Sequence, residues 1–338
     1  MEKRKINVAL VGATGMIGRT FLEVLGERFE NLNIDNLYLY ASKRSAGTKI
    51  DFLGKELEVL ELIEEEFIGN PRKIDYALFS AGGSVSKKFA PILSDNGIVV
   101  IDNSSAWRMD KDVPLVVPEV NGEDIKEHKG IIANPNCSTI QAVVPLKVLD
   151  NAFKLKRVIY STYQAVSGAG ASGYNDLENG IKGESPKKFD YPIFDNVIPQ
   201  IDVFGEDGYT FEEIKMINET RKILHNDELK VTATTVRVPV YVSHSESVNL
   251  EFEKPFEMKE VFEVLRNGEG IVLEDDTENK KYPMPRFVAG SDEVFVGRVR
   301  RDNSAENALN IWVVADNTRK GAATNAIQIL EYILEKEI

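Results

Sequence analysis

The sequence predicts a two-domain α/β protein, in which an N-terminal, doubly wound parallel sheet is followed by an α+β domain with a largely antiparallel sheet. The chain has 338 residues, of which 43% are hydrophobic, enough for a large core that usually divides into two domains. In the first half, short apolar strands alternate with amphipathic helices, as in a parallel sheet covered on both faces. After about residue 150 the strands lengthen and alternate apolar with polar side chains, which is typical of an antiparallel sheet.

The first strand, residues 6–11, runs directly into the glycine-rich segment 12–18, which has the spacing G-x-x-G-x-x-G. An amphipathic helical pattern follows it. Glycines in such a turn let the backbone approach a pyrophosphate, which then rests on the N-terminus of the helix. The arrangement predicts a Rossmann-like dinucleotide site, although this glycine spacing alone also occurs in structural turns.

The segment after the second strand, residues 36–40, indicates which dinucleotide is bound. An NAD-preferring site places Asp or Glu at this point, where it binds the ribose 2′-hydroxyl. This chain has two hydroxyls and two cations there instead: Ser42, Lys43, Arg44 and Ser45. They suit a 2′-phosphate, so the predicted cofactor is NADP; the alternative is a solvated basic loop without a ligand.

Further strands of the first half are predicted at residues 56–60, 74–79 and 98–101. Ligands bind at the carboxyl ends of parallel strands, so one crevice should be lined by the loops at Gly12, Ser42, Gly82 and Asn103. Arg108 ends the last of these loops. It could hold a phosphate or carboxylate by two parallel hydrogen bonds, whereas an isolated arginine is more often a surface residue.

The single cysteine, Cys137, follows a short apolar strand at residues 131–133 and the helix breaker Pro135. An apolar helical pattern begins at Ile140, which places Cys137 in the first turn of a helix with Asn136 as the N-cap. Backbone N–H groups and the helix dipole would lower the pKa of the thiol there and favour a nucleophilic thiolate. The alternative is a buried structural cysteine.

The second half begins with an alternating strand at residues 156–166, which runs into the glycine-rich stretch 164–173. These glycines either permit close approach to a ligand or form a plain loop. Residues 183–210 contain several prolines and little periodicity, and we expect a lid or part of a subunit interface. In the helix that follows, Glu212 and Lys215 share a face; taken alone they suggest an ordinary surface ion pair.

Residues 231–252 form a long, β-branched, alternating segment. His244 occupies the phase of the apolar residues, so it is either a core residue or a base held in a pocket. Arg237 has the opposite phase, but Pro239 can break the register, and the phase therefore leaves open whether Arg237 and His244 share a pocket. Strands at residues 294–299 and 308–315 and a final amphipathic helix complete the chain.

Composition excludes several classes of function. The net charge of −13 and the pI near 5.0 argue against a surface for nucleic acid or an anionic membrane. No apolar stretch approaches the roughly 20 residues that span a bilayer. One cysteine excludes an intrachain disulfide, so a reducing cytoplasm is the simplest compartment. One cysteine and three scattered histidines also lack the spacing of a metal site.

Together these segments resemble the aspartate-semialdehyde dehydrogenases nearly end to end. The resemblance rests on separate motifs in the same order: 12–15 (GATG), 44–47 (RSAG), 134–137 (NPNC), Gln164 with Ser167-Gly168, Glu212 with Lys215, Arg237 with His244, and Asp316-Asn317. It implies an oxidoreductase that converts L-aspartyl-4-phosphate to L-aspartate-4-semialdehyde with NADP, releasing phosphate through a cysteine thioester. Such an enzyme serves the biosynthesis of lysine, diaminopimelate, methionine, threonine and isoleucine.

The resemblance also implies a role for each site residue. Cys137 is the nucleophile, His244 the acid/base, and Gln164 orients the substrate. Arg237 holds the substrate α-carboxylate and Glu212 its amino group, while Lys215 and Arg108 hold the phosphate. NADP contacts are expected at Gly12, Thr14, Gly15, Met16, Ile17, Ser42, Arg44, Ser45, Ser167, Gly168 and Asn317.

The expected organisation is an NADP-binding domain over residues 1–136, joined by the C-terminal helix 317–338, and a catalytic and dimerisation domain over 137–316. A homodimer is expected. Two alternatives stay open: an N-acetyl-glutamyl-phosphate reductase, and a non-catalytic NADP-binding sensor. The segments 183–210 and 267–292 do not align with the family by motif and have no assigned role.

Overall fold

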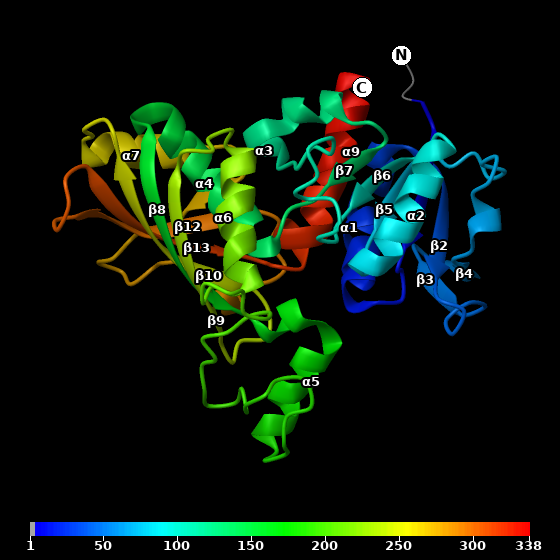
Figure 1. Cartoon of the computed structure of the whole chain (residues 1–338), viewed down its shortest axis with the longest axis horizontal. Helices are drawn as coiled ribbons and strands as arrows, with labels where there is room; N and C mark the ends of the chain where they lie inside the picture. Colours follow the sequence, from blue (N-terminus) through cyan, green and yellow to red (C-terminus); the bar gives the residue numbers. More distant parts are fainter. Residues whose placement is uncertain (1–3) are drawn as a thin grey trace. The chain divides into compact units, whose positions relative to one another are not determined.

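The computed structural model describes residues 4–338, which divide into two compact units. The first unit consists of the chain up to Pro135 together with the C-terminal segment Ala322–Ile338. The second unit is Asn136–Gly321. Each unit is built around one sheet (Figure 1). The predicted α/β class, with a parallel sheet in the N-terminal part and a mostly antiparallel sheet in the C-terminal part, is confirmed.

The sheet of the first unit has the strand order β3-β4-β2-β1-β5-β6-β7. Only β3 runs antiparallel to its neighbour, in a hairpin with β4. The chain moves outward from β1 to β4 and then returns to β5 on the other side of β1, so the topological switch point lies between β1 and β5. The strands are β1 (Ile6–Val11), β2 (Ile34–Ala41), β3 (Lys49–Phe52), β4 (Lys55–Glu61), β5 (Tyr76–Phe79), β6 (Val99–Asp102) and β7 (Ile131–Ala133).

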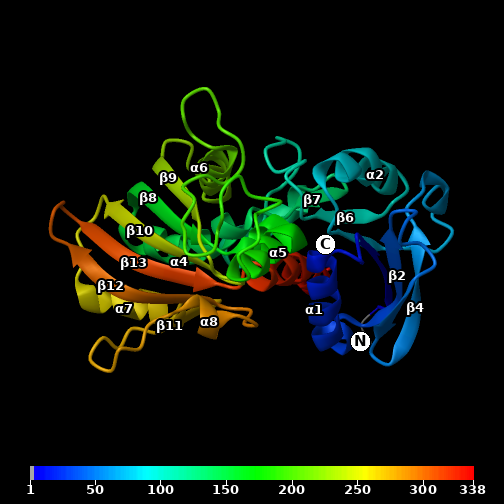
Figure 2. The ribbon, with the colours of Figure 1, turned by 90° about the horizontal axis from the view of Figure 1, so that it is seen from below.

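The helices of the first unit cover both faces of this sheet, with α1 and α2 on opposite sides (Figure 2). Helix α9 packs beside α1, where Arg28 Nη1 lies 2.6 Å from Glu331 Oε2, and it buries Ile327 and Leu330 in the core of this unit. The C-terminal helix thus belongs to the first unit. The bounds are α1 (Met16–Leu32), α2 (Gly83–Asp95), α3 (Pro118–Asn121) and α9 (Thr324–Lys336), with the short 3₁₀ helices η1 (Glu64–Glu66) and η2 (Gly122–Glu127).

The sheet of the second unit has the order β11-β12-β13-β10-β8-β9. Its central pairs are antiparallel, and the pairs at the two edges, β11 with β12 and β8 with β9, are parallel. The strands are β8 (Leu155–Gln164), β9 (Lys230–Arg237), β10 (His244–Phe252), β11 (Ile271–Leu273), β12 (Val294–Asp302) and β13 (Ala308–Ala315).

The segment 231–252 differs from the continuous alternating stretch that the sequence suggests. It forms two strands, β9 and β10, that are separated in the sheet by β8. Pro239 lacks a ladder N–H, and Ser243 adopts a left-handed φ of 77°, so the extended chain cannot continue between the strands. The phase of His244 is therefore set within β10, where Val248 and Leu250 share its buried face.

Helices α4 (Cys137–Phe153), α6 (Phe211–Ile223) and α7 (Met258–Arg266) cover one face of this sheet. Helix α4 is buried almost all round, which explains why its apolar pattern has little amphipathic bias. The remaining elements are η3 (Val166–Ala169), α5 (Gly170–Ile181), α8 (Pro285–Val288) and the π-helical turn η4 (Arg319–Ala323). Across residues 4–338, no helix combines the length and apolarity needed to cross a membrane.

Residues 183–210, here called the excursion, contain no helix or strand, as their sequence predicts. The excursion is nevertheless held at defined points. Buried Asp176 of α5 accepts hydrogen bonds from the backbone N–H groups of Lys187, Lys188 and Phe189. Further on, Ile198 pairs with Arg237 at the open edge of β9 through two backbone hydrogen bonds.

Candidate active site

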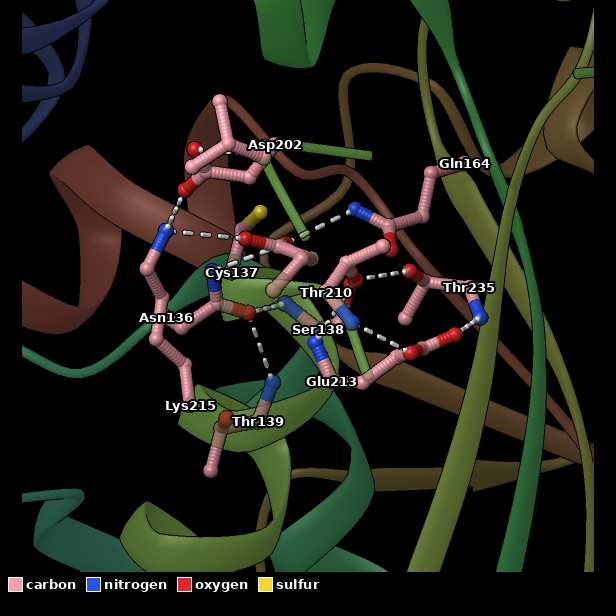
Figure 3. A network of polar contacts seen from close by, with 12 residues as sticks. Asn136, Cys137, Ser138, Thr139, Gln164, Asp202, Thr210, Glu213, Lys215 and Thr235 are labelled. Atoms are coloured by element: carbon pink, nitrogen blue, oxygen red, sulfur yellow. Dashed lines mark hydrogen bonds and ion pairs between the residues drawn. The ribbon is translucent and has the colours of Figure 1, made fainter. Parts of the chain in front are cut away.

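Helix α4 begins at Cys137, and Asn136 is its N-cap, as the sequence predicts. The Asn136 side-chain oxygen accepts the N–H groups of Ser138 at 3.0 Å and Thr139 at 3.4 Å (Figure 3). Pro135 prevents the helix from starting earlier, because proline lacks a backbone N–H and disfavours helical backbone angles at the residue before it. Cys137 is therefore fixed at the start of the helix, and it is partly exposed.

Two carboxylates of α6 hold the N-cap in turn. The backbone N–H of Asn136 donates to Glu219 Oε2 at 2.7 Å, and its Nδ2 donates to Glu212 Oε1 at 3.0 Å. All three residues are buried. Glu219 was not foreseen from the sequence; the available signal is its spacing of two helical turns from Glu212, which puts both carboxylates on one face of α6.

His244, the first residue of β10, lies against the cysteine. Its Nε2 is 3.2 Å from Cys137 Sγ, and its Nδ1 accepts the backbone N–H of Ala165 at 2.9 Å. Because Nδ1 is an acceptor, the neutral imidazole carries its proton on Nε2 and presents it to the sulfur. Complete burial, reinforced by the charge of Arg237, holds the pKa of His244 well below its ordinary value, so the ring is neutral.

The sequence phase left open whether Arg237 and His244 lie together, and the structure places both against one turn. The 3₁₀ turn at Gly168 passes against both: a Cβ built on Gly168 would lie 2.8 Å from Arg237 Nη1 and 3.3 Å from the His244 ring. Arg237 is buried, and its Nη1 donates to the carbonyl of Ala165 at 2.7 Å. Gly168 is thus the glycine of the stretch 164–173 that lies against Arg237 and His244.

Glu212 is not part of a surface ion pair, contrary to the simplest interpretation of its spacing from Lys215. Its side chain is buried because α6 packs against α4, and Oε1 also accepts a hydrogen bond from Gln164 Nε2 at 3.1 Å. Burial acts to raise the pKa of Glu212, but the charge of Lys215 and the donors on Gln164 and Asn136 outweigh it, so the net pKa is lowered. Glu212 is therefore a buried, ionised carboxylate next to the N-cap of α4.

Lys215 lies between two carboxylates. Its Nζ is 3.2 Å from Glu212 Oε2 and 2.7 Å from Asp202 Oδ2, a residue of the excursion (Figure 3). Burial acts to lower the pKa of Lys215, but the two carboxylates outweigh it and raise the pKa. Asp202 was not foreseen from the sequence, because its segment has no periodicity that would indicate which element it contacts.

Three of the expected cofactor residues lie in the second unit, beside the loop that leads to His244. Asn317 Oδ1 accepts the backbone N–H of Ser243 at 2.9 Å, and Asn317 Nδ2 donates to Ser167 Oγ at 3.0 Å. Gly168 follows Ser167 directly in the same turn. The second unit thus brings Ser167, Gly168 and Asn317 together with His244.

The remaining expected cofactor residues lie in the first unit, around the turn between β1 and α1. Gly12 has a φ of +88°, and a Cβ there would lie 2.6 Å from the carbonyl oxygen of Ser80. Gly15 is the N-cap of α1 without a side-chain hydrogen bond, and the first turn, which begins with Met16 and Ile17, contains no acidic residue. This helix terminus therefore fits an anionic pyrophosphate.

The loop after β2 meets this glycine turn. Thr14 Oγ1 donates to Ser45 Oγ at 3.4 Å, and the carbonyl of Ser42 accepts the N–H of Ser45 at 2.8 Å, which folds the loop into a tight turn. Arg44 is exposed at the tip of the turn. Two hydroxyls and an exposed guanidinium fit a phosphate on the ribose.

Arg108 also belongs to the first unit, and it is not the surface residue that an isolated arginine suggests. It is 8% exposed, with Nε donating to the carbonyl of Asn134 and Nη2 to the carbonyl of Asn103, both at 3.0 Å. Its guanidinium is thus oriented by the backbone that leads to Cys137. Within residues 4–338, no group of three or more His, Cys, Asp or Glu side chains could hold a metal ion.

Comparison with known proteins identifies the family of this chain. Residues 7–128 match the family described as semialdehyde dehydrogenase, NAD binding domain, and residues 146–320 match semialdehyde dehydrogenase, dimerisation domain. The chain is 56% identical to the aspartate-semialdehyde dehydrogenase of Aquifex aeolicus, covering 97% of this chain and 98% of that one. It is 49% identical to the enzyme of Campylobacter jejuni, with 98% of both chains covered.

Solved structures give the same result. Aspartate semialdehyde dehydrogenase II of Vibrio cholerae, complexed with ASA, has a TM-score of 0.93 at 45% identity over 99% of this chain and 100% of that one. The enzyme of Candida albicans, solved with NADP, has a TM-score of 0.78 at 28% identity over 99% of both chains. The chain belongs to the aspartate-semialdehyde dehydrogenase family, as its motifs suggested, and is an oxidoreductase of amino-acid biosynthesis with a Rossmann-like NAD(P)-binding domain.

Proposed function

We propose that this protein catalyses the NADP-dependent reductive dephosphorylation of L-aspartyl-4-phosphate to L-aspartate-4-semialdehyde, and the reverse phosphorylating oxidation, through a thioester on Cys137. The observation that carries the proposal is the contact between Cys137 Sγ, at the N-terminus of α4, and Nε2 of a buried, neutral His244. The product would supply the biosynthesis of lysine, diaminopimelate, methionine, threonine and isoleucine.

The first chemical step in the reducing direction is acylation of the cysteine. The thiolate of Cys137 attacks the carbonyl carbon of the acyl phosphate, the C–S bond forms, and the bond from that carbon to the phosphate oxygen breaks. The leaving phosphate takes the electron pair of the broken bond. The dipole of α4 and the Nε2–H of His244 stabilise the thiolate before the attack.

The second step is reduction of the thioester, for which bound NADPH supplies the hydride. His244 donates its Nε2 hydrogen bond to the oxyanion that develops on the substrate carbonyl. Collapse of this oxyanion to the aldehyde returns the electron pair of the C–S bond to the sulfur, so the cycle ends with the thiolate it began with. The acid/base role expected for His244 is thereby narrowed to that of a hydrogen-bond donor, since Nδ1 is engaged by Ala165.

The substrate is proposed to bind through complementary charges. Glu212, ionised and buried, receives the α-amino group, and Arg237 receives the α-carboxylate through its guanidinium. Gln164 orients the reacting group from its place beside Glu212. Lys215 and Arg108 hold the phosphate, with Arg108 oriented by the carbonyls of Asn103 and Asn134.

We propose NADP rather than NAD as the preferred cofactor. Arg44, Ser42 and Ser45 would hold the 2′-phosphate, and the uncapped N-terminus of α1 would hold the pyrophosphate. The supporting contacts are expected from Gly12, Thr14, Gly15, Met16, Ile17, Ser167, Gly168 and Asn317. The first unit would thus be the NADP-binding domain and the second unit the catalytic and dimerisation domain.

A cytoplasmic homodimer is the proposed assembly. The description of the family that matches residues 146–320 as a dimerisation domain supports it. So do the large apolar side chains that the excursion exposes, among them Tyr191, Phe194, Val203 and Phe204. The excursion is therefore proposed as part of the subunit interface.

The main rival is an N-acetyl-glutamyl-phosphate reductase. Its substrate has no free α-amine, so the buried charge of Glu212 would lose its partner, which favours aspartate semialdehyde. A non-catalytic NADP sensor is disfavoured because it has no use for the contact between Cys137 and His244.

The test is an absorbance assay of NADP reduction with aspartate semialdehyde and phosphate, run in parallel with NAD and with N-acetyl-glutamate semialdehyde. We expect phosphate-dependent activity with aspartate semialdehyde and NADP, and its abolition in Cys137→Ala. A Cys137→Ala variant with full activity would exclude the thioester, and preference for the acetylated substrate would support the rival.

A further inference from the structure

Asp202 contacts the lysine to which the proposed function assigns the phosphate. Its Oδ2 lies 2.7 Å from Lys215 Nζ, closer than the 3.2 Å that separates Nζ from Glu212 Oε2. The Lys215 ammonium thus already has two anionic partners on α6 and the excursion. A phosphate that binds to the same ammonium meets a carboxylate of like charge.

The backbone around Asp202 is fixed on both sides. Ile198 is paired with the edge of β9, and the carbonyl of Val203 accepts the N–H of Phe211, the first residue of α6. Between these anchors Asp202 adopts a left-handed φ of 70°, which non-glycine residues seldom adopt. Its Oδ1 accepts the N–H of Val203 at 2.9 Å, so the side chain and the turn stabilise each other.

The two carboxylates on Lys215 differ in how they are held. Glu212 is buried and has further donors on Asn136 and Gln164, so it cannot leave without exposing those groups unpaired. The Asp202 side chain is 38% exposed and keeps its bond to Val203 through the other oxygen. Asp202 is therefore the partner that an incoming anion can displace from Lys215.

We propose that Asp202 competes with phosphate for Lys215, and that it thereby sets the affinity of the site for inorganic phosphate. This inference rests on the proposed function, in which Lys215 binds phosphate. The Asp202 carboxylate holds the Lys215 ammonium in place between turnovers. When Asp202 returns to Lys215, it assists the release of phosphate. The same competition lowers the affinity of the site for phosphate.

The experiment compares Asp202→Asn with the wild type in the oxidising direction. Asparagine tolerates the left-handed φ and can still accept from Val203, so the change removes the charge and little else. We expect the KM for phosphate to fall about three- to tenfold, while the KM for aspartate semialdehyde stays within about twofold. A merely structural role of Asp202 predicts the opposite, a weaker site for both substrates.

Asp195→Asn is the matched control. Asp195 is an exposed acid of the same excursion, also with a positive φ of 55°. Its replacement should leave the KM for phosphate unchanged. A second reference is Lys215→Met, which should raise this KM at least about tenfold and should abolish the effect of Asp202→Asn in the double variant, because the shared ammonium is gone.

The outcomes separate the two proposals. A wild type without phosphate dependence contradicts the proposed function and this inference together. A phosphate-dependent wild type with an unchanged or raised KM in Asp202→Asn contradicts this inference alone, as does an equal fall in Asp195→Asn. If the amide variant does not fold, Asp202→Gly gives the same comparison, because glycine adopts the positive φ without strain.

Discussion

The N-termini of α1 and α4 are both suited to anions, but the protein treats them differently. At α1 the N-cap is Gly15, with no side-chain bond and no acid in the first turn. At α4 the N-cap Asn136 accepts two of the first N–H groups and is itself held by Glu212 and Glu219. The first terminus is open to an external phosphate, whereas the second is closed around its own cysteine. In the proposed function, the open helix end would bind the cofactor and the closed one would fix the reacting sulfur.

Removal of the His244 imidazole should have the largest effect on activity among the variants that retain Cys137, because His244 contacts the sulfur at the closed terminus of α4. We expect His244→Ala to lower kcat by about 100- to 1000-fold, through loss of the Nε2 donor to the sulfur and the oxyanion. Since the pKa of His244 lies well below its ordinary value, protonation of the ring should cause no loss of wild-type activity between about pH 6 and 8. Steady-state kinetics over that pH range would measure both.

The matched control is His128→Ala in the first unit, a half-buried histidine whose Nδ1 accepts the N–H of Gly130. Its kcat should equal that of the wild type. A wild-type kcat/KM that falls with a midpoint near the ordinary pKa of histidine, and loses this limb in His244→Ala, would show that the ring titrates and acts as a base.

The same substitution at two glycines should separate the two termini. At Gly168, whose φ is not left-handed, the nearest atoms to an added Cβ belong to side chains, Arg237 at 2.8 Å and His244 at 3.3 Å. These side chains can shift, so we expect near wild-type thermal stability but a kcat/KM lower by about 10- to 100-fold. Gly12→Ala meets backbone at 2.6 Å and has a φ of +88°, so it should lose about 1–3 kcal/mol of stability and bind NADP weakly.

Thermal unfolding, kcat/KM for aspartate semialdehyde and alkylation of Cys137 by iodoacetamide would measure this pair of variants. Alkylation should be altered in Gly168→Ala and unchanged in folded Gly12→Ala. If Gly168→Ala instead unfolded as readily as Gly12→Ala, the packing of Arg237 and His244 against Gly168 would contribute to the stability of the second unit. Its role would then not be limited to positioning these two side chains.

The two regions also differ in how far they could be predicted from sequence. The α1 site is made by consecutive residues, so strand, glycine turn and helix can be recognised together. The site at α4 combines residues 136–137, 164–168, 212–219 and 237–244, which only the packing of α6 on α4 and the sheet brings together. Taken alone, Glu212, Arg108 and His244 each suggested an ordinary structural role, and only the order of several motifs indicated the site. Asp202 carries no local signal, and the signal for Glu219 is limited to its spacing from Glu212 on α6.

Glu246 should affect stability rather than catalysis, and it tests how the sheet next to His244 tolerates a buried polar group. It lies two residues beyond His244 on β10, is fully buried, and neither of its carboxyl oxygens has a hydrogen-bond partner among the described residues. Burial alone raises the pKa of Glu246 well above its ordinary value, with no charged group acting against it. The carboxyl is therefore neutral in the folded protein at neutral pH.

This protonation makes stability depend on pH with a definite sign. Below about pH 4.3 the Glu246 carboxyl is protonated in both the folded and the unfolded chain and contributes no pH dependence. As pH rises above that value, only the unfolded chain releases the proton, so the free energy of unfolding falls by up to about 1.4 kcal/mol per pH unit until the folded-state pKa is reached. Glu246→Gln cannot titrate and should therefore become progressively more stable than the wild type from about pH 5 to 8.

Urea unfolding at several pH values and one protein concentration would measure the difference, with Glu251→Gln as the control. Glu251 lies on the opposite face of β10 and pairs with Arg157 at 2.9 Å, so its loss should lower stability slightly at neutral pH, by less than about 1 kcal/mol. Equal losses in both variants at pH 7 would mean that Glu246 is ionised and paired. A gain in stability confined to Glu246→Gln would mean that β10 carries a neutral acid next to His244 at the expense of stability. Such a cost is common near functional sites.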